Sequence, residues 1–120
     1  MSVARFGSLL YIEPQRPAKM NQVMADRYSF LKDMMNRARR GIYNKSNGSF
    51  GAGCSYNGIH FCKCGARSNN YDLLLDCGLV TNSLAYHYIE FHWDEINANE
   101  RAKLETLHLR NMMATSDRVY

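Results

Sequence analysis

The stretch that decides the fold lies between residues 60 and 95. It holds two short segments rich in residues that bind metals, His60-Phe-Cys-Lys-Cys-Gly65 and Thr81-Asn-Ser-Leu-Ala-Tyr-His-Tyr-Ile-Glu-Phe-His-Trp-Asp-Glu95. The first segment is expected to be part of a β-hairpin and the second a helix. Zinc takes four cysteine or histidine ligands at tetrahedral corners, often one pair from each of two short elements. We therefore expect Zn2+ to be bound by Cys62, Cys64, His87 and His92.

The spacing of these ligands leaves alternatives open. The two histidines are five positions apart on the expected helix, and such side chains converge where a helix tightens or opens near its C-terminal turn. A single residue separates the two cysteines, whereas zinc sites typically have about two to four there. His60 or Cys77 can therefore replace Cys62 as a ligand, and Cys54 is the cysteine least expected to bind metal. The competing interpretation is a metal-free cluster of packed cysteines and hydrogen-bonded histidines.

Residues 61–92 resemble a zinc finger of the two-cysteine, two-histidine kind, because thiols on an expected hairpin precede two histidines on the following helix. The resemblance covers about a quarter of the chain and implies a metal-stapled ββα-like unit. It does not imply a helix that reads bases. The interval before the histidines is about ten residues longer than in a DNA-reading finger, and the helix is apolar on most sides.

The chain of 120 residues is expected to form one small α+β domain, stapled by zinc, with a long N-terminal helix, a short β-hairpin and two C-terminal helices. Proline at a helix start and glycine at a helix end predict that the long helix begins at Pro17 and ends at Gly41. The expected divisions are an extended arm at 1–16, this helix at 17–41, a Gly/Asn/Ser-rich loop at 42–58, the zinc-finger-like unit at 59–95 with strands at 59–62 and 71–76, and a helix at 97–114.

The start of the last helix has its own signal. Asn97 is followed three residues later by Glu100, the pattern of a capping box, in which each side chain accepts a backbone N–H from the other end of the first turn. We therefore expect Asn97 and Glu100 to cap one another.

The composition indicates a folded protein that is expected to lie inside the cell. Hydrophobic residues make up 46% of the chain, and no apolar run reaches the length of about 18 residues that a membrane span needs. Four cysteines without an export signal predict a reducing compartment, the cytoplasm or nucleus, or the inside of a virion. No membrane partner is expected.

Positive charge is concentrated in the first part of the chain. Residues 1–50 carry nine Lys and Arg against three Asp and Glu, a net charge of +6, whereas residues 51–120 carry six against eight, a net charge of −2. Basic clusters bind phosphates in nucleic acids. The candidate nucleic-acid-binding residues are Arg37, Arg39, Arg40 and Lys45.

Three functional hypotheses follow, of which an enzyme is the least favoured. Two His-x-x-Glu pairs, His87 with Glu90 and His92 with Glu95, could serve acid/base or hydrolytic metal chemistry, but no catalytic motif accompanies them. A site with four protein ligands also leaves no position for substrate. We therefore expect a non-enzymatic zinc-binding interaction module, acting as a structural or assembly protein, a virion component included, with a protein partner. The alternative is a zinc-finger-like nucleic-acid-binding protein.

Overall fold

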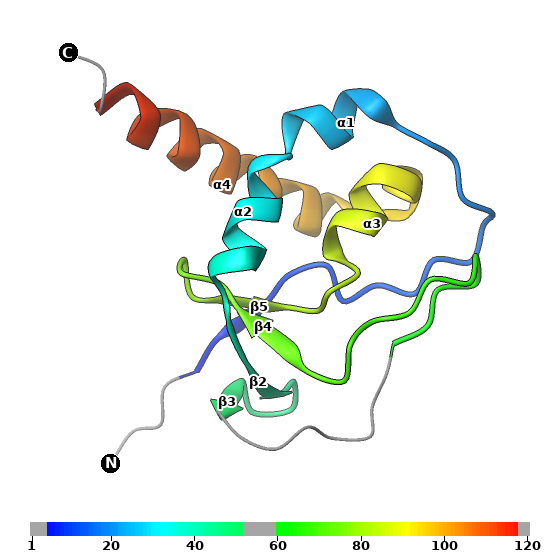
Figure 1. Ribbon diagram of the computed structural model, residues 1–120, viewed down its shortest axis with the longest axis horizontal. Helices are drawn as coiled ribbons and strands as arrows, with labels where there is room; N and C mark the ends of the chain where they lie inside the picture. Colours follow the sequence, from blue (N-terminus) through cyan, green and yellow to red (C-terminus); the bar gives the residue numbers. More distant parts are fainter. Residues whose placement is uncertain (1–4, 52–59, 118–120) are drawn as a thin grey trace.

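The computed structural model describes residues 5–51 and 60–117 of the chain. Figure 1 shows a curled sheet with the helices gathered beside it, and α4 extends away from the body toward the C-terminus. The expected α+β class is confirmed. The elements are β1 (Gly7–Ser8), α1 (Gln22–Arg27), α2 (Phe30–Arg37), β2 (Arg39–Asn44), β3 (Ser49–Gly51), β4 (Asp72–Leu74), β5 (Leu79–Thr81), α3 (Ala85–Phe91), the 3-10 helix η1 (Trp93–Glu95) and α4 (Ala98–Asp117).

The five strands pair in the order β1-β5-β4-β2-β3. The pair of β1 with β5 is parallel, in the register Gly7 to Leu79, and the other pairs are antiparallel. The part of the N-terminal arm that the structure describes therefore pairs with the sheet of its own chain. It also brings Leu9 and Leu10, which follow β1, into the core.

The segment 17–41, expected as one long helix, instead contains two short helices and the start of a strand. Residues 17–21 are not helical because they lie along the end of α3. There the N–H groups of Lys19 and Asn21 donate to carbonyl oxygens of the last turn of α3 at 2.8 Å. The Asn21 side chain then caps α1 by accepting the Met24 N–H at 3.1 Å. Tertiary hydrogen bonds thus replace the helix start expected at Pro17.

Tyr28 interrupts the expected helix between α1 and α2. Its ring is 3% exposed and stacks on Trp93 with 5.6 Å between ring centroids, and its hydroxyl donates to Glu105 at 2.9 Å. A turn at Tyr28 lets this side chain enter the core together with Leu31, the buried residue of α2. Core packing outweighs the helix propensity of the segment here.

Gly41 lies inside β2 rather than at a helix end. A Cβ atom at this position would clash with the Gly51 carbonyl oxygen and the Phe50 ring of the neighbouring strand β3. The glycine therefore allows a close approach between two strands and not the left-handed cap that we expected. Consequently, the first part of the expected loop 42–58 contains the end of β2 and the strand β3. Cys54 and the other residues of 52–58 lie outside the described residues.

The expected hairpin of 59–62 with 71–76 is wrong in its pairing. Phe61 forms an isolated antiparallel bridge with Arg67, and β4 pairs with β2 and β5 instead. Gly78, with a left-handed φ of 89°, allows the tight reversal that pairs β4 with β5, and the other edge of β4 is occupied by β2. Residue 59 lies outside the described residues.

Only half of the expected capping box forms at α4. The Asn97 side chain accepts the Glu100 N–H at 3.0 Å, but the Glu100 side chain accepts the Leu10 N–H at 2.7 Å rather than reaching back to Asn97. Glu100 thereby holds the N-terminal arm against α4. Leu10 has a φ of 58°, so its N–H needs a partner that regular secondary structure does not supply.

The core lies between the sheet and the helices. Its largest fully buried apolar side chains come from the arm, α2, α3, α4 and the segment after β4, namely Leu9, Leu10, Leu31, Leu75, Tyr88, Ile89 and Leu104. Among the described residues, no helix has the length and the hydrophobicity needed to cross a membrane.

Candidate metal centre

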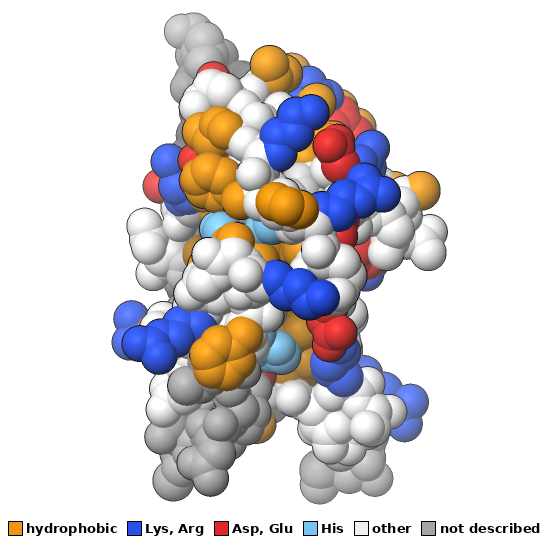
Figure 2. All heavy atoms as spheres, turned by 90° about the vertical axis from the view of Figure 1, so that its right-hand side faces the viewer, with side chains coloured by type: hydrophobic (Ala, Val, Ile, Leu, Met, Phe, Trp, Pro, Cys, Tyr) orange, Lys and Arg blue, Asp and Glu red, His pale blue; other side chains and the backbone are white. Residues whose placement is uncertain are grey.

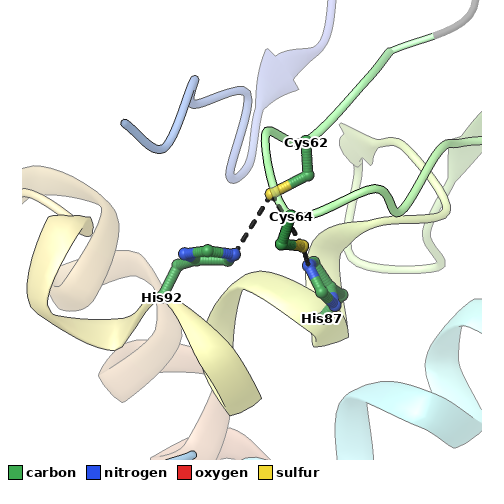
Figure 3. A group of neighbouring side chains, drawn as sticks. All are labelled: Cys62, Cys64, His87 and His92. Atoms are coloured by element: carbon green, nitrogen blue, oxygen red, sulfur yellow. Dashed lines mark hydrogen bonds between the residues drawn. The ribbon is translucent and has the colours of Figure 1, made fainter. Parts of the chain in front are cut away.

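The four expected zinc ligands lie together between the 60–68 loop and the end of α3. Figure 3 shows Cys62 facing His92 and Cys64 facing His87. The Sγ atom of Cys62 is 3.1 Å from Nε2 of His92, that of Cys64 is 3.1 Å from Nε2 of His87, and the two sulfurs are 3.4 Å apart. All four ligand atoms lie within 4.8 Å of one another. The group can hold a metal ion.

The end of α3 explains how His87 and His92 reach one site. At 3.6 residues per turn, side chains five positions apart point roughly 140° away from each other. The helix ends at Phe91, however, and His92 adopts φ −135° and ψ 32°, which lie outside helical geometry. This change turns the His92 side chain toward the cysteines. The convergence expected at the helix end is therefore present.

A tight turn presents the two thiols. The Gly65 N–H donates to the Cys62 carbonyl at 2.9 Å, and the Cys62 N–H donates to the Ala66 carbonyl at 2.8 Å. Gly65 has a φ of 104°, which other residues rarely adopt. This turn brings both cysteines to the same side in spite of the single residue between them. The short spacing is thus compatible with a shared ligand site.

The distances fit a tetrahedral zinc ion. Bonds of about 2.0 Å to nitrogen and about 2.3 Å to sulfur place the ligand atoms of such a site about 3.3 to 3.8 Å apart. The observed separations of 3.1 to 3.4 Å and the upper limit of 4.8 Å bracket these values. The four atoms are therefore close enough together to share one ion.

The site has a buried half and an exposed half. Cys62 and His92 are 4% and 3% exposed, whereas His87 is half-buried and Cys64 is exposed. On the face drawn in Figure 2, histidine side chains reach the surface near the middle, among hydrophobic and uncharged side chains. The inner pair, Cys62 and His92, belongs to the core, whereas the outer pair, Cys64 and His87, lies nearer the surface.

Burial shifts the pKa values of two of these side chains in opposite directions. Desolvation by burial raises the pKa of the Cys62 thiol, and a hydrogen bond from the Cys64 backbone opposes part of this rise. Desolvation lowers the pKa of His87, and the charge of a protonated His92 would lower it further. Both neutral forms are therefore favoured in the folded protein. Neutral imidazole is the form that binds zinc, whereas the thiol must lose its proton.

Glu95 lies behind His92, on the side away from the cysteines. Its Oε2 atom is 3.7 Å from Nδ1 of His92, and its carboxylate accepts the N–H groups of Gln15 at 2.7 Å and Arg16 at 3.2 Å. The Gln15 bond is the main cause that lowers the pKa of Glu95. In the sequence, Glu95 is visible as part of the His-x-x-Glu pair with His92. That pair indicates acid/base chemistry as readily as a carboxylate that positions a metal ligand.

The alternative ligands lie outside the four-residue group. The His60 ring packs edge-on against Tyr11 with 5.6 Å between centroids, and Cys77 occupies the turn between β4 and β5. Neither belongs to the group of metal-binding side chains found among the described residues. Cys54 lies outside the described residues.

The four candidate nucleic-acid-binding residues do not share one face. Arg37 pairs with Asp76 at 3.2 Å, Arg40 lies over the Tyr71 ring, and Lys45 lies over the Tyr11 ring. Arg39 and Arg40 are consecutive in β2, so their side chains point to opposite sides of the sheet. On the face drawn in Figure 2, lysines and arginines are likewise scattered among other side chains.

Comparison with known proteins gave no match: no protein-family model, no curated protein and no solved structure matches this chain. The assignment of a function therefore depends on the geometry of the site.

Proposed function

We propose that the chain is a small, non-enzymatic interaction protein whose fold is closed by one structural zinc ion. The observation that carries the proposal is the convergence of two thiols and two imidazoles, from segments more than twenty residues apart, within 4.8 Å. Two sulfur and two nitrogen donors are a common ligand set of structural zinc and suit magnesium or calcium poorly. Cys62, Cys64, His87 and His92 would be the ligands.

A closed ligand set supports a structural rather than a catalytic ion. Catalytic zinc usually keeps three protein ligands and leaves the fourth position to water or substrate. Here four protein ligands would fill a tetrahedral shell. The ion would pin the 60–68 loop, which has little regular hydrogen bonding of its own, to α3.

Exposed apolar side chains support an interaction role. Phe61, directly before the first ligand, is 69% exposed, and Val23 on α1 is 71% exposed. Leu109, Met112 and Met113 on the projecting part of α4 are each more than half exposed. Methionine side chains adapt well to a partner surface. Nucleic-acid binding is less supported, because the basic candidates are dispersed or already paired.

Metal analysis of the purified protein tests the proposal. One zinc per chain is expected in the unchanged protein, with loss of zinc in Cys64→Ser and His87→Ala. Cys77→Ser and His60→Ala are matched controls and should retain zinc, and they also test the two alternative ligands. A metal-free native protein, or full zinc retention in Cys64→Ser, would refute the site.

Cobalt replacement tests whether the ion is structural. Cobalt(II) bound by two thiolates and two imidazoles should give the absorption of a tetrahedral site. Added azide should leave this spectrum unchanged if protein ligands fill every position. A spectrum that shifts with azide would reveal an open position and favour an enzyme.

A further inference from the structure

We infer that Glu95 is the positioning residue of the metal centre: it accepts the Nδ1 proton of His92 and thereby connects the metal to the N-terminal arm at Gln15 and Arg16. The inference rests on the proposed zinc site and goes beyond its four ligands. Its basis is a buried ring nitrogen, unpartnered within the described part of the chain, beside a carboxylate that the fold holds in place.

The tautomer of His92 follows from which of its ring nitrogens faces the cysteines. A neutral imidazole carries one proton, and the nitrogen facing Cys62 is Nε2. If Nε2 binds the metal, the proton must be on Nδ1. Nδ1 is buried and has no hydrogen-bond partner among the described residues, in a side chain that is 1% exposed. A buried N–H of this kind needs an acceptor.

Glu95 offers the acceptor for this N–H. Oε2 of Glu95 is 3.7 Å from Nδ1, slightly beyond hydrogen-bond distance. Within residues 5–51 and 60–117, the same Oε2 accepts only the Arg16 N–H, at 3.2 Å, so it retains a lone pair for His92. A movement of a few tenths of an ångström, as the ring settles on the ion, would form the bond. Histidines that bind metals commonly donate their second N–H to a carboxylate in this way.

Glu95 also contacts the N-terminal arm. Oε1 of Glu95 accepts the Gln15 N–H at 2.7 Å, and Arg16 shares the lining of a pocket of about 140 Å³ with His92 and Glu95. Pro14, next to Gln15, is buried. The same carboxylate therefore meets both the arm and the metal ligand, and its Oε2 atom lies near both. Zinc binding and docking of the arm should strengthen each other through this group.

Glu95→Gln is the decisive variant, because it keeps the shape and one oxygen acceptor but removes the charge. Zinc affinity, measured by competition with a chelating indicator, should fall about 10- to 100-fold. Glu90→Gln on α3 is the matched control and should bind zinc like the unchanged protein. Glu95→Asp, which keeps the carboxylate, should lose less affinity than Glu95→Gln.

A second measurement separates positioning from a merely structural role. In the zinc-loaded, unchanged protein, a long-range proton–nitrogen NMR spectrum should show His92 protonated at Nδ1, with a slowly exchanging signal that Glu95→Gln loses. Equal zinc affinity of Glu95→Gln and Glu90→Gln, or a His92 proton on Nε2, would overturn the inference while leaving the zinc site intact. An unchanged protein that binds no zinc would instead overturn the proposed function, and this inference with it.

Discussion

The Sγ atom of Cys62 lies 3.1 Å from Nε2 of His92, and both side chains are buried in the core. The outer pair, Cys64 and His87, has the same separation but is more exposed. The inner pair is therefore held partly by packing, whereas the outer pair depends more on a shared ion. Loss of metal should affect the two sides of the site unequally.

We predict that chelation loosens the 60–68 loop and leaves α3 and α4 folded. The loop has one isolated bridge, between Phe61 and Arg67, and few buried side chains. In contrast, α3 places Tyr88 and Ile89 in the core. Hydrogen exchange followed by mass spectrometry, with and without chelator, should show faster exchange in the loop alone. Equal loss of protection in α4 would show that the ion supports the whole fold.

The zinc-free protein should become less stable as the pH falls. Folding lowers the pKa of His87, so below an unfolded value of about 6.5 the unfolded chain binds more protons than the folded one. The resulting loss of stability develops as the pH falls from about 6.5 through the lower folded pKa. Urea unfolding of the zinc-free protein at several pH values measures it, and His87→Gln should show a smaller dependence. A stability that rises on acidification would contradict the shift.

Zinc binding should release protons, because Cys62 holds its proton more firmly than an exposed thiol. Burial raises the pKa of Cys62, so this thiol is protonated in the zinc-free protein at neutral pH. Binding as thiolates should release about two protons from the cysteines. Calorimetry in buffers of different ionisation enthalpy gives the number directly. Release of one proton or fewer would mean that a cysteine does not bind the ion.

Asp72 should contribute more to stability than the neighbouring surface acid Asp76. Asp72 is 2% exposed and accepts the Tyr11 hydroxyl at 2.6 Å and the Tyr43 N–H at 3.0 Å. Asp72→Ala removes the acceptor of both bonds and should cost about 1 to 3 kcal/mol. Asp76→Ala breaks an exposed ion pair with Arg37 and should cost at most about 1 kcal/mol. Urea unfolding compares them, and equal costs would refute the role of Asp72.

The Cys62, Cys64, His87 and His92 cluster could be predicted from the sequence, because cysteine and histidine have few chemical roles and each pair lies within one short segment. The path of 17–41 could not, because it depends on hydrogen bonds between Lys19 and the distant end of α3. The role of Gly41 could not be predicted for a similar reason, since only strand pairing reveals the neighbour that excludes a Cβ atom. Glu95 carries a visible signal, but its partners at Gln15 and Arg16 are remote in sequence.

Nucleic-acid binding, the alternative function, would make the affinity of the chain depend on salt concentration. If the basic residues bind phosphates as a single patch, neutralising Arg37, Arg39 and Arg40 together should reduce the slope of log affinity against log salt by about 0.9 for each phosphate that is no longer neutralised. The structure predicts a smaller reduction of this slope than three lost phosphate contacts would give. Arg37 is already paired with Asp76, and Arg39 and Arg40 point to opposite sides of β2.

Because Arg39 and Arg40 point to opposite sides, only one of them can face a bound nucleic acid. Of the single variants Arg39→Ala and Arg40→Ala, only one should therefore reduce the slope of log affinity against log salt, by about 0.9. Fluorescence anisotropy with a labelled duplex at several salt concentrations measures each slope, and Lys32→Ala on α2 is a matched control for a loss of charge. A slope reduced by nearly three times this amount in the triple variant would show that the arginines act as one phosphate-binding surface. That result would favour nucleic-acid binding over protein interaction, because dispersed cations cannot follow one phosphate backbone.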